Sequence, residues 1–453
     1  MEMNKQHIVN TIKNNGILTI SVIFLLTNYI YKDFDIRFAY GYIVMLVVGA
    51  ILIIAGRTIR PFTSSKIWFV ILAVICSGYS ILPSANKGET TSAITMSMLA
   101  FAVLVICSKT GMKESKVILN VLDIAALVIA GYVILIAIRP SFYWVNIYPN
   151  LSKTVQLQAY TLLRIGYGVP IGGSTTYADY VIAFALFRNV ARLIFGKNRD
   201  KLTVGIAVKL GVYLIAILFE NRRSELLMIL VCLVVMYFMS LDRRHRADFL
   251  NKVSALVLIA AIGIFGFILL INSGRAARLQ QTVAALVSNS FDDQLTGGRF
   301  TLWEKAFSLF KAHPLTGIGW ERFITHNQYE HDVHNTYLQW LCETGVVGFV
   351  LIFIPYMNLL LIAFKNCQKI LKEEKASLDV TVLAIVGFAM QLFYALINII
   401  DPAFYHLNFF CFLGIAVIMT DSSQHIYESE AGAQLQQPAK PEKQGALTEA
   451  WAK

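Results

Sequence analysis

Charged residues are scarce in this sequence. Asp, Glu, Lys and Arg make up 15% of the 453 residues, whereas soluble globular domains carry about 25%. Hydrophobic residues make up 57%. The scarcity of charge argues against an ordinary soluble domain, and the apolar content excludes intrinsic disorder. This composition is typical of a protein that lies in a lipid bilayer, which requires apolar runs of about 20 residues.

Cysteine is also rare, with six residues of which five fall in apolar runs and Cys367 lies just beyond one. Because no cysteine falls in a long polar loop, we expect no disulfide framework and no zinc–cysteine site. The N-terminal segment MEMNKQHIVNTIKNN is polar and basic, and the apolar run after it lacks a small-residue cleavage site. We therefore expect a first membrane helix there and not a removed signal peptide.

Twelve apolar runs predict an all-α fold, a polytopic bundle of about 12 transmembrane helices. In lipid the backbone must satisfy its own hydrogen bonds, so each spanning run is expected to be a helix. The runs cover residues 16–31, 38–56, 67–82, 91–108, 117–138, 175–195, 203–220, 224–241, 253–272, 337–364, 378–400 and 403–420.

The distribution of Lys and Arg predicts the orientation of this bundle. If the N-terminus is cytoplasmic, the internal loops hold 19 of these residues and the short external loops hold 5. Basic residues concentrate on the cytoplasmic side of membrane proteins, so we expect both termini to be cytoplasmic. The net charge of +11 is explained in this way, and we expect no nucleic-acid partner.

Two long segments, residues 139–174 and 273–336, interrupt the short connections and fall on the predicted external side. The first contains SFYWVNIY (141–148), an aromatic cluster typical of the lipid headgroup boundary. We expect residues 1–421 to form the transmembrane bundle. Residues 422–453 are polar and rich in Gln, Ala, Lys and Glu, which predicts a disordered cytoplasmic tail.

The second long segment is the largest polar feature of the chain. Within it, RFTLWEKAFSLF (299–310) predicts a helix that lies on the membrane surface or caps the bundle, and PLTGIG (314–319) should end that helix. The aromatic residues of its apolar face are Phe300, Trp303, Phe307 and Phe310.

Four of the eight histidines lie in the same segment, at positions 313, 326, 331 and 334. His334 begins HNTYLQW, where the segment meets the tenth span, so its imidazole should be fixed at the membrane–water boundary. A fixed imidazole that titrates near neutral pH can act as a general base. The alternative is an interfacial histidine that hydrogen-bonds a loop carbonyl. No zinc pattern such as HExxH is present, and we expect no metal site.

Arg222 and Arg223 occupy the short external turn ENRRSE (220–225), against the positive-inside bias. Guanidinium groups bind phosphate in a bidentate way, so a diphosphate at the outer boundary would suit them. The alternative is local pairing with the flanking Glu220 and Glu225. Arg299 is a third candidate phosphate-binding residue, and its alternative is a helix-start arginine that faces water.

The segments PLTGIGWERF (314–323) and HNTYLQWLCETGVVGF (334–349) resemble the signature of the O-antigen ligase and O-antigen polymerase superfamily. That signature places a His-Asn pair at the end of a large external loop, followed by a Glu-x-Gly-x-x-Gly-like stretch. GGRFTLW (297–303) resembles the Gly-Arg-x-x-x-Trp element, and NRRSELL (221–227) a Ser-Arg-Gly-type turn with Ser224 in place of glycine. That departure leaves the choice between Arg222 and Arg223 open.

The resemblance implies a glycosyltransferase C-like fold and a metal-independent, inverting glycosyltransferase without a cofactor. The donor would be an undecaprenyl-diphosphate-linked glycan at the outer face of the bacterial cytoplasmic membrane. His334 would activate the acceptor hydroxyl, while Arg223 and Arg299 would bind the leaving diphosphate. Further substrate-binding candidates are Arg222, Arg278, Asn335, Tyr337 and Glu343.

We expect polymerisation of lipid-linked repeat units, with a flippase and a chain-length regulator as candidate partners. Ligation of the glycan to lipid A–core, or to protein, is the alternative within the superfamily. A lipid-linked oligosaccharide flippase or other transporter is the alternative of a different class. A coupled transporter needs ionisable groups near the midplane, and the predicted spans hold few of them.

Overall fold

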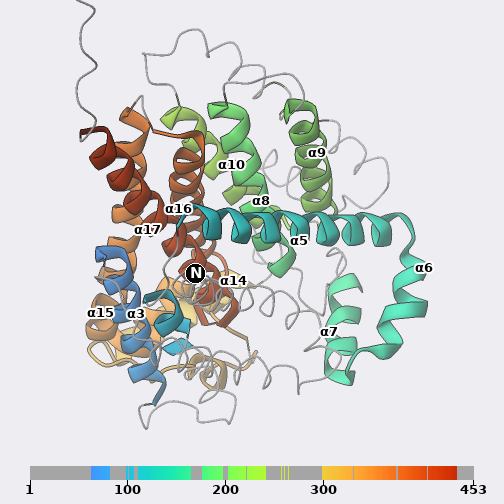
Figure 1. The fold of residues 1–453 in the computed structure, drawn as a ribbon. Coiled ribbons are helices and arrows are strands. Elements are labelled where there is room, and N and C mark those ends of the chain that lie inside the picture. Colours follow the sequence, from blue (N-terminus) through green and yellow to red (C-terminus); the bar gives the residue numbers. More distant parts are fainter. Residues whose placement is uncertain are drawn as a thin grey trace, which may run out of the picture.

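The computed structural model describes residues 63–81, 98–99, 101–106, 111–164, 176–196, 202–220, 222–240, 257, 260, 264, 298–329, 331–373, 376–405 and 407–435. Every regular element in these ranges is a helix, which confirms the all-α class (Figure 1). Five helices are long and apolar enough to cross a membrane: Ser64–Ile81, Met112–Ile138, Thr336–Lys372, Leu378–Ile397 and Phe409–Glu430. The predicted spans 16–31 and 38–56, and most of 91–108 and 253–272, lie outside the described residues. The number of twelve therefore stays a prediction.

Helix α16 (Leu378–Ile397) is the central element of the described bundle. It is buried on nearly every side and packs against α8 (Thr176–Phe195), α10 (Arg223–Met239), α15 (Thr336–Lys372) and α17 (Leu407–Leu435). A helix that is hydrophobic all round is typical of the core of a large protein or of a membrane span.

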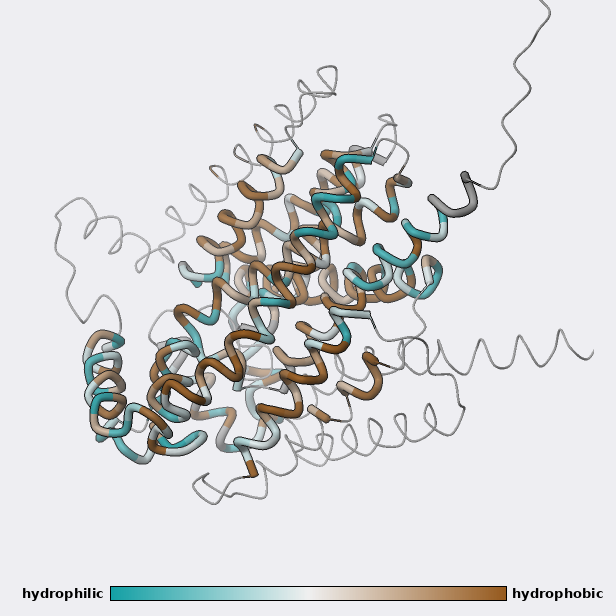
Figure 2. The backbone as a smooth tube through the Cα atoms, turned by 90° about the vertical axis from the view of Figure 1, so that its left-hand side faces the viewer, coloured by the Kyte–Doolittle hydropathy of each residue, from teal (hydrophilic) through white to brown (hydrophobic). Residues whose placement is uncertain are grey.

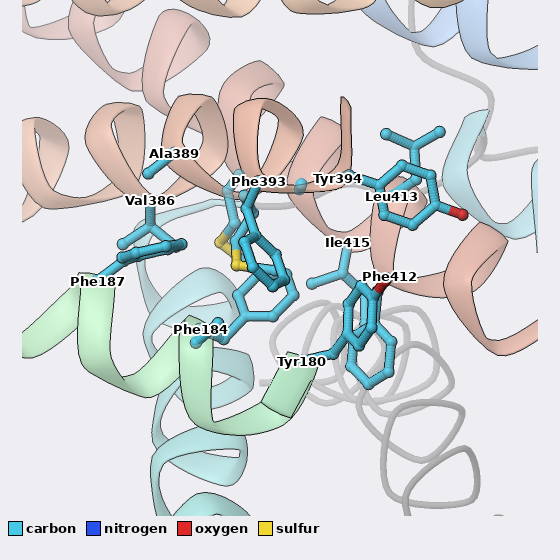
Figure 3. Packing of buried hydrophobic residues seen from close by; sticks show 14 of the residues in the cluster. Tyr180, Phe184, Phe187, Val386, Ala389, Phe393, Tyr394, Phe412, Leu413 and Ile415 are labelled. Atoms are coloured by element: carbon cyan, nitrogen blue, oxygen red, sulfur yellow. The ribbon is translucent and has the colours of Figure 1, made fainter. Parts of the chain in front are cut away.

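Aromatic side chains fill the space between α8, α16 and α17, as Figure 3 shows. The ring centroids of Tyr180 and Phe187 in α8 lie 5.3 Å and 6.1 Å from that of Phe393 in α16. Phe184 approaches Phe412 of α17, with 5.8 Å between the ring centroids. Edge-to-face pairs contribute about 0.5–1.5 kcal/mol each beyond area burial. In lipid such close packing replaces the hydrophobic effect as the force between helices.

A glycine brings α16 and α17 into close contact. A Cβ at Gly387 would lie 2.6 Å from Thr420 Oγ1, so a larger residue would push the helices apart. Beyond this contact α17 continues as a helix to Leu435, past residue 421 where the tail was predicted to begin. Asn366 of α15 donates its Nδ2 to Ser423 Oγ at 2.8 Å and so attaches the extension to the bundle. Residues 436–453 lie outside the described residues.

Many large hydrophobic side chains face outward on the bundle helices. Val128 in α5 (Met112–Ile138), Val208 in α9 (Leu202–Glu220) and Phe238 in α10 are each more than 60% exposed. Figure 2 shows hydrophobic residues predominating along the long helices. Apolar surface on this scale is typical of a bundle surrounded by lipid.

The first long segment is helical as far as Arg164 instead of being an irregular loop. After α5 the chain forms α6 (Pro140–Phe142), a π-helical turn (Tyr143–Ile147), a 3-10 turn (Tyr148–Asn150) and α7 (Lys153–Arg164). Figure 1 shows α6 and α7 beyond the end of α5, at the side of the bundle. The Trp144 and Tyr148 rings lie 4.8 Å apart, so the predicted aromatic cluster does form.

The second long segment contains the predicted helix, α14 (Arg299–Ala312). The protein itself buries another face than the aromatic one, so the placement of the aromatic face on the membrane surface stays a prediction. Leu302 and Ala306 are buried, whereas Phe300 and Phe307 are 43% and 46% exposed. A helix face must match the shape of the surface beneath it, and the small side chain of Ala306 allows a close approach that a phenylalanine would prevent.

Candidate functional site

The site is built around a break in α15. Gly345 has φ 66° and ψ −172°, a backbone conformation available essentially only to glycine, and it interrupts the helix. Interrupting a helix frees backbone groups that must find other partners. Ile318 N donates to Cys342 O at 3.1 Å, Gly319 N to Glu343 O at 2.8 Å, and Val346 N to Pro314 O at 2.8 Å.

The segment 314–319 therefore ends α14, as predicted, and also inserts its backbone into the break. The segment and α15 approach each other closely at two glycines, one in each. A Cβ at Gly317 would lie 2.3 Å from the carbonyl of Glu343, and a Cβ at Gly345 would lie 2.3 Å from the carbonyl of Leu315. Both glycines have positive φ, so no other residue type fits either position without strain.

Glu343 joins three parts of the chain from a fully buried position. Its carboxylate accepts hydrogen bonds from the backbone N–H groups of Glu321 and Phe323, at 2.8 Å and 3.1 Å, and from Tyr405 Oη at 2.8 Å. Gln339 Nε2 also donates to it, at 3.2 Å. Because all four donors belong to the protein, the geometry supports a role in holding the segment against α15. The predicted contact with substrate would require these bonds to break.

His334 lies at the start of α15, as the sequence predicts, in the left-handed region with φ 54°. Both of its neighbours are held. Trp303 Nε1 of α14 donates to Val333 O at 3.0 Å. Asn335 Oδ1 caps α15 by accepting from Leu338 N at 3.0 Å. Asn335 was expected to bind substrate, but in this structure its side chain forms the helix cap.

Burial and nearby cations lower the pKa of the His334 imidazole to about 4, from its ordinary value of 6.5. Burial is the largest cause, because it disfavours the charged ring. Arg299, His331 and Arg222 act in the same direction, and Asp332 opposes them. The ring is therefore neutral at pH 7 and able to accept a proton.

Arg222 is already paired with carboxylates of the protein. It precedes α10 and forms ion pairs with Glu225 and with Asp401, the latter at 3.8 Å between Nη1 and Oδ2. The predicted local pairing thus holds for Arg222 and Glu225. Arg223 is the first residue of α10, but its side chain lies outside the described part of the structure, as does the whole of Arg278.

Tyr337 lies half-buried on the first turn of α15. Its Oη donates to Ala395 O of α16 at 2.8 Å, and its ring packs edge-on against Trp340. Like Glu343 and Asn335, it was predicted to bind substrate and is engaged by the protein itself. Among the described residues, no three or more His, Cys, Asp or Glu side chains form a group that could hold a metal ion.

The sequence reasoning missed the turn at residues 398–405, between α16 and α17. Thr336 donates its N–H to Asn398 O at 2.8 Å and its Oγ1 to Asn398 Oδ1 at 2.7 Å. Tyr405 reaches Glu343, and Asp401 reaches Arg222. The Asp-Pro pair at 401–402 signals a turn, but its position beside Thr336 at the start of α15 depends on how α16 packs against α15.

Two buried acids near Arg222 were also missed as site residues. Asp179 of α8 and Glu220 of α9 are fully buried, and their carboxylate oxygens lack a hydrogen-bond partner in the described structure. Both acids interact electrostatically with Arg222.

These features define a multi-pass helical membrane protein in which a half-buried histidine with a left-handed backbone conformation lies at the start of one long helix. Residues 208–353 match the family model described as O-antigen ligase. Over 137 residues the chain is 28% identical to the exopolysaccharide production protein ExoQ of Rhizobium meliloti (strain 1021). This match covers 26% of the chain and 29% of that relative's length. The two comparisons support the predicted resemblance to the O-antigen ligase and polymerase superfamily.

Proposed function

We propose that this chain is a glycosyltransferase that polymerises undecaprenyl-diphosphate-linked repeat units at the outer face of the cytoplasmic membrane. The observation that carries the proposal is the position of His334, whose pKa is lowered. It lies at the start of α15, and Trp303 of α14, the helix that Arg299 begins, donates a hydrogen bond to the carbonyl of the preceding residue. A proton acceptor beside fixed cations is what transfer from a diphosphate donor requires. The hydroxyl must lose a proton while the leaving group gains negative charge.

The reaction is a single displacement at the anomeric carbon of the donor. The acceptor hydroxyl oxygen forms a bond to that carbon as its proton passes to His334. The bond between the carbon and the phosphate oxygen breaks, and its electron pair leaves with the undecaprenyl diphosphate. Attack from the side opposite the leaving group inverts the configuration of the carbon.

Arginine supplies the electrostatic stabilisation in this proposal, without a metal ion. Arg299 and Arg223 bind the diphosphate, where a planar guanidinium fork offers two parallel hydrogen bonds to phosphate oxygens. Arg222 forms ion pairs with Glu225 and Asp401, and it contributes its positive charge from that fixed position. Glu343 and Asn335 hold the segment and the helix start that carry His334.

Polymerisation is preferred because the curated relative is an exopolysaccharide production protein. The family model carries the description of a ligase, which favours transfer to lipid A–core or to protein as the second candidate. In both cases the donor and the proton transfer are the same, and only the acceptor differs. Supplying purified protein with each acceptor in turn would distinguish them.

His334→Ala is the test of the proposed base. Loss of a general base typically costs 10²- to 10⁴-fold in rate, so we expect a reduction of about that size. The measurement is in vitro transfer of a lipid-linked glycan at matched protein amounts. His313→Ala and His326→Ala are controls that should retain most activity. Near-normal turnover by a well-folded His334→Ala protein would remove the mechanism, and transport of lipid-linked glycan without transfer would favour the flippase alternative.

A further inference from the structure

Gln339 lies in the first turns of α15 and is 1% exposed. Its Nε2 donates to two carboxylates, Glu343 Oε1 at 3.2 Å and Asp332 Oδ1 at 3.4 Å. The amide group of Gln339 is the donor in both contacts, so it connects the two acidic side chains.

The Glu343 end of this hydrogen-bonded bridge is held by several further contacts. Glu343 is fully buried and accepts from two backbone N–H groups and from Tyr405 in addition to Gln339. Gln339 is thus anchored through Glu343, and the position of Asp332 follows from Gln339. A reactive group is oriented more precisely when the residues that contact it are themselves held by hydrogen bonds than when they lie on a flexible loop.

The other end of the bridge, Asp332, lies two residues before the proposed base on the same short segment. Among the charged groups that act on His334, Arg299 from α14, Arg222 before α10 and His331 on the same segment oppose a proton on the ring. Asp332 is the group that favours it. A carboxylate in this position stabilises the imidazolium that forms when the ring takes a proton, as in catalytic His–Asp pairs generally.

We propose that Asp332 is a positioning residue that supports His334 as it takes the acceptor proton, and that Gln339 holds Asp332 in place through Glu343. The chain of contacts runs from Glu343 to Gln339 to Asp332 and then, through charge, to His334. This inference rests on the proposed function, because it assigns a task to Asp332 only if His334 is the base. The proton comes from the acceptor hydroxyl and leaves to solvent after the donor bond has broken.

Asp332→Asn tests the inference with two measurements on the full-length protein. Removing the negative charge should lower kcat by roughly 10- to 100-fold, with little change in KM. It should also move the acidic limb of kcat/KM to lower pH, because the ring then holds a proton less readily. Independently of activity, the pH midpoint for modification of His334 by diethyl pyrocarbonate, followed by mass spectrometry, should fall in the same direction.

Gln339→Met provides a second variant that keeps side-chain length and removes the bridge, and it should shift both measurements in the same direction by less. Glu304→Gln removes an exposed carboxylate of α14 and is the charge-matched control, expected to behave as the unaltered protein. An unchanged kcat and an unchanged modification midpoint in Asp332→Asn would overturn the inference. If His334→Ala is inactive at the same time, the proposed function survives; if His334→Ala is active, the proposed function fails as well.

Discussion

His334 adopts a backbone conformation that is unfavourable for a residue with a Cβ atom. Its φ of 54° belongs to the left-handed region, where a residue with a Cβ has a cost of about 1–3 kcal/mol. The conformation persists because Trp303 fixes the carbonyl of Val333 and because Asn335 begins α15. Strain of this kind is concentrated at functional positions, where the surrounding structure determines the direction of one side chain.

The lowered pKa of His334 has a consequence for pH dependence. A base must be neutral to act, and the free protein keeps this ring neutral at every pH above about 4, whereas an ordinary histidine would be neutral only above 6.5. We therefore expect kcat/KM to stay level from neutral pH down to about pH 5 and then to fall. The measurement is a pH–rate profile of transfer at low donor concentration.

The profile of kcat should differ from that of kcat/KM. Bound diphosphate carries negative charge next to Arg299 and Arg222, which cancels part of their effect on His334 and raises the pKa of the imidazole in the complex. The acidic limb of kcat is then expected at higher pH than that of kcat/KM. Coincident limbs near pH 6.5 would mean that the ring is not in the environment described.

The two neighbouring arginines should respond differently to the same substitution. Arg223→Lys keeps the charge and loses the planar fork, so it should reduce transfer if the diphosphate is bound in a bidentate way. Arg222→Lys can still pair with Glu225 and should mainly lower thermal stability. Transfer rates and melting temperatures of both variants separate the two roles, and full activity in the double variant would show that neither arginine binds the donor.

At the scale of elements, α15 and the segment 314–319 form one unit. Neither could adopt its conformation alone, because the break at Gly345 leaves backbone groups that the segment satisfies. The same insertion brings Glu321 and Phe323 to Glu343. The start of α15, with His334, is thereby attached to α14, with Arg299.

Gly345→Ala should disrupt this unit. The residue would carry a Cβ at positive φ and 2.3 Å from the carbonyl of Leu315, so strain and collision add together. We expect a fall in the free energy of unfolding of about 1–3 kcal/mol or more, measured as a lower melting temperature in detergent. Gly131→Ala, in α5 with open space around it, is the control and should have little effect. Equal melting temperatures in the two variants would contradict the insertion.

At the scale of the whole molecule, the site is assembled from segments far apart in the chain. Arg222 precedes α10, Arg299 begins α14, His334 begins α15 and Asp401 precedes α17. The packing of α16 against α10, α15 and α17 brings these helix ends together. Substitutions inside the bundle that separate the helices are therefore expected to weaken transfer without touching the substrate.

The proposed orientation can be tested with single cysteines. Tyr329 is 48% exposed in the segment before α15, and Lys372 lies exposed at the far end of that helix. Tyr329→Cys should react with a membrane-impermeant maleimide in spheroplasts, and Lys372→Cys only after permeabilisation. The native cysteines of the described residues are buried and should give little background. The reverse labelling pattern would invert the topology and move the site to the cytoplasm.

The amino-acid sequence by itself determined the membrane class, the long helices of the described bundle and the position of His334 at a helix start. These features depend on local properties: apolar run length, helical periodicity and turn-forming residues. The helix of residues 299–310 was predicted closely, and so was its end at PLTGIG. The superfamily resemblance also lay within one continuous stretch of sequence, which is why it could be recognised without a structure.

Only the tertiary structure decided which polar residues are free to act. Asn335, Tyr337 and Glu343 were predicted to bind substrate, but each is hydrogen-bonded within the protein. Asn335 caps α15, Tyr337 donates to a backbone carbonyl of α16, and Glu343 accepts from several chain segments. The contacts of Asp401 with Arg222 and of Tyr405 with Glu343 could not be predicted, because these partners are distant in sequence. Hydrogen bonds and charge act over a few ångströms in space, whatever the separation along the chain, and in lipid the packing of helices sets those distances.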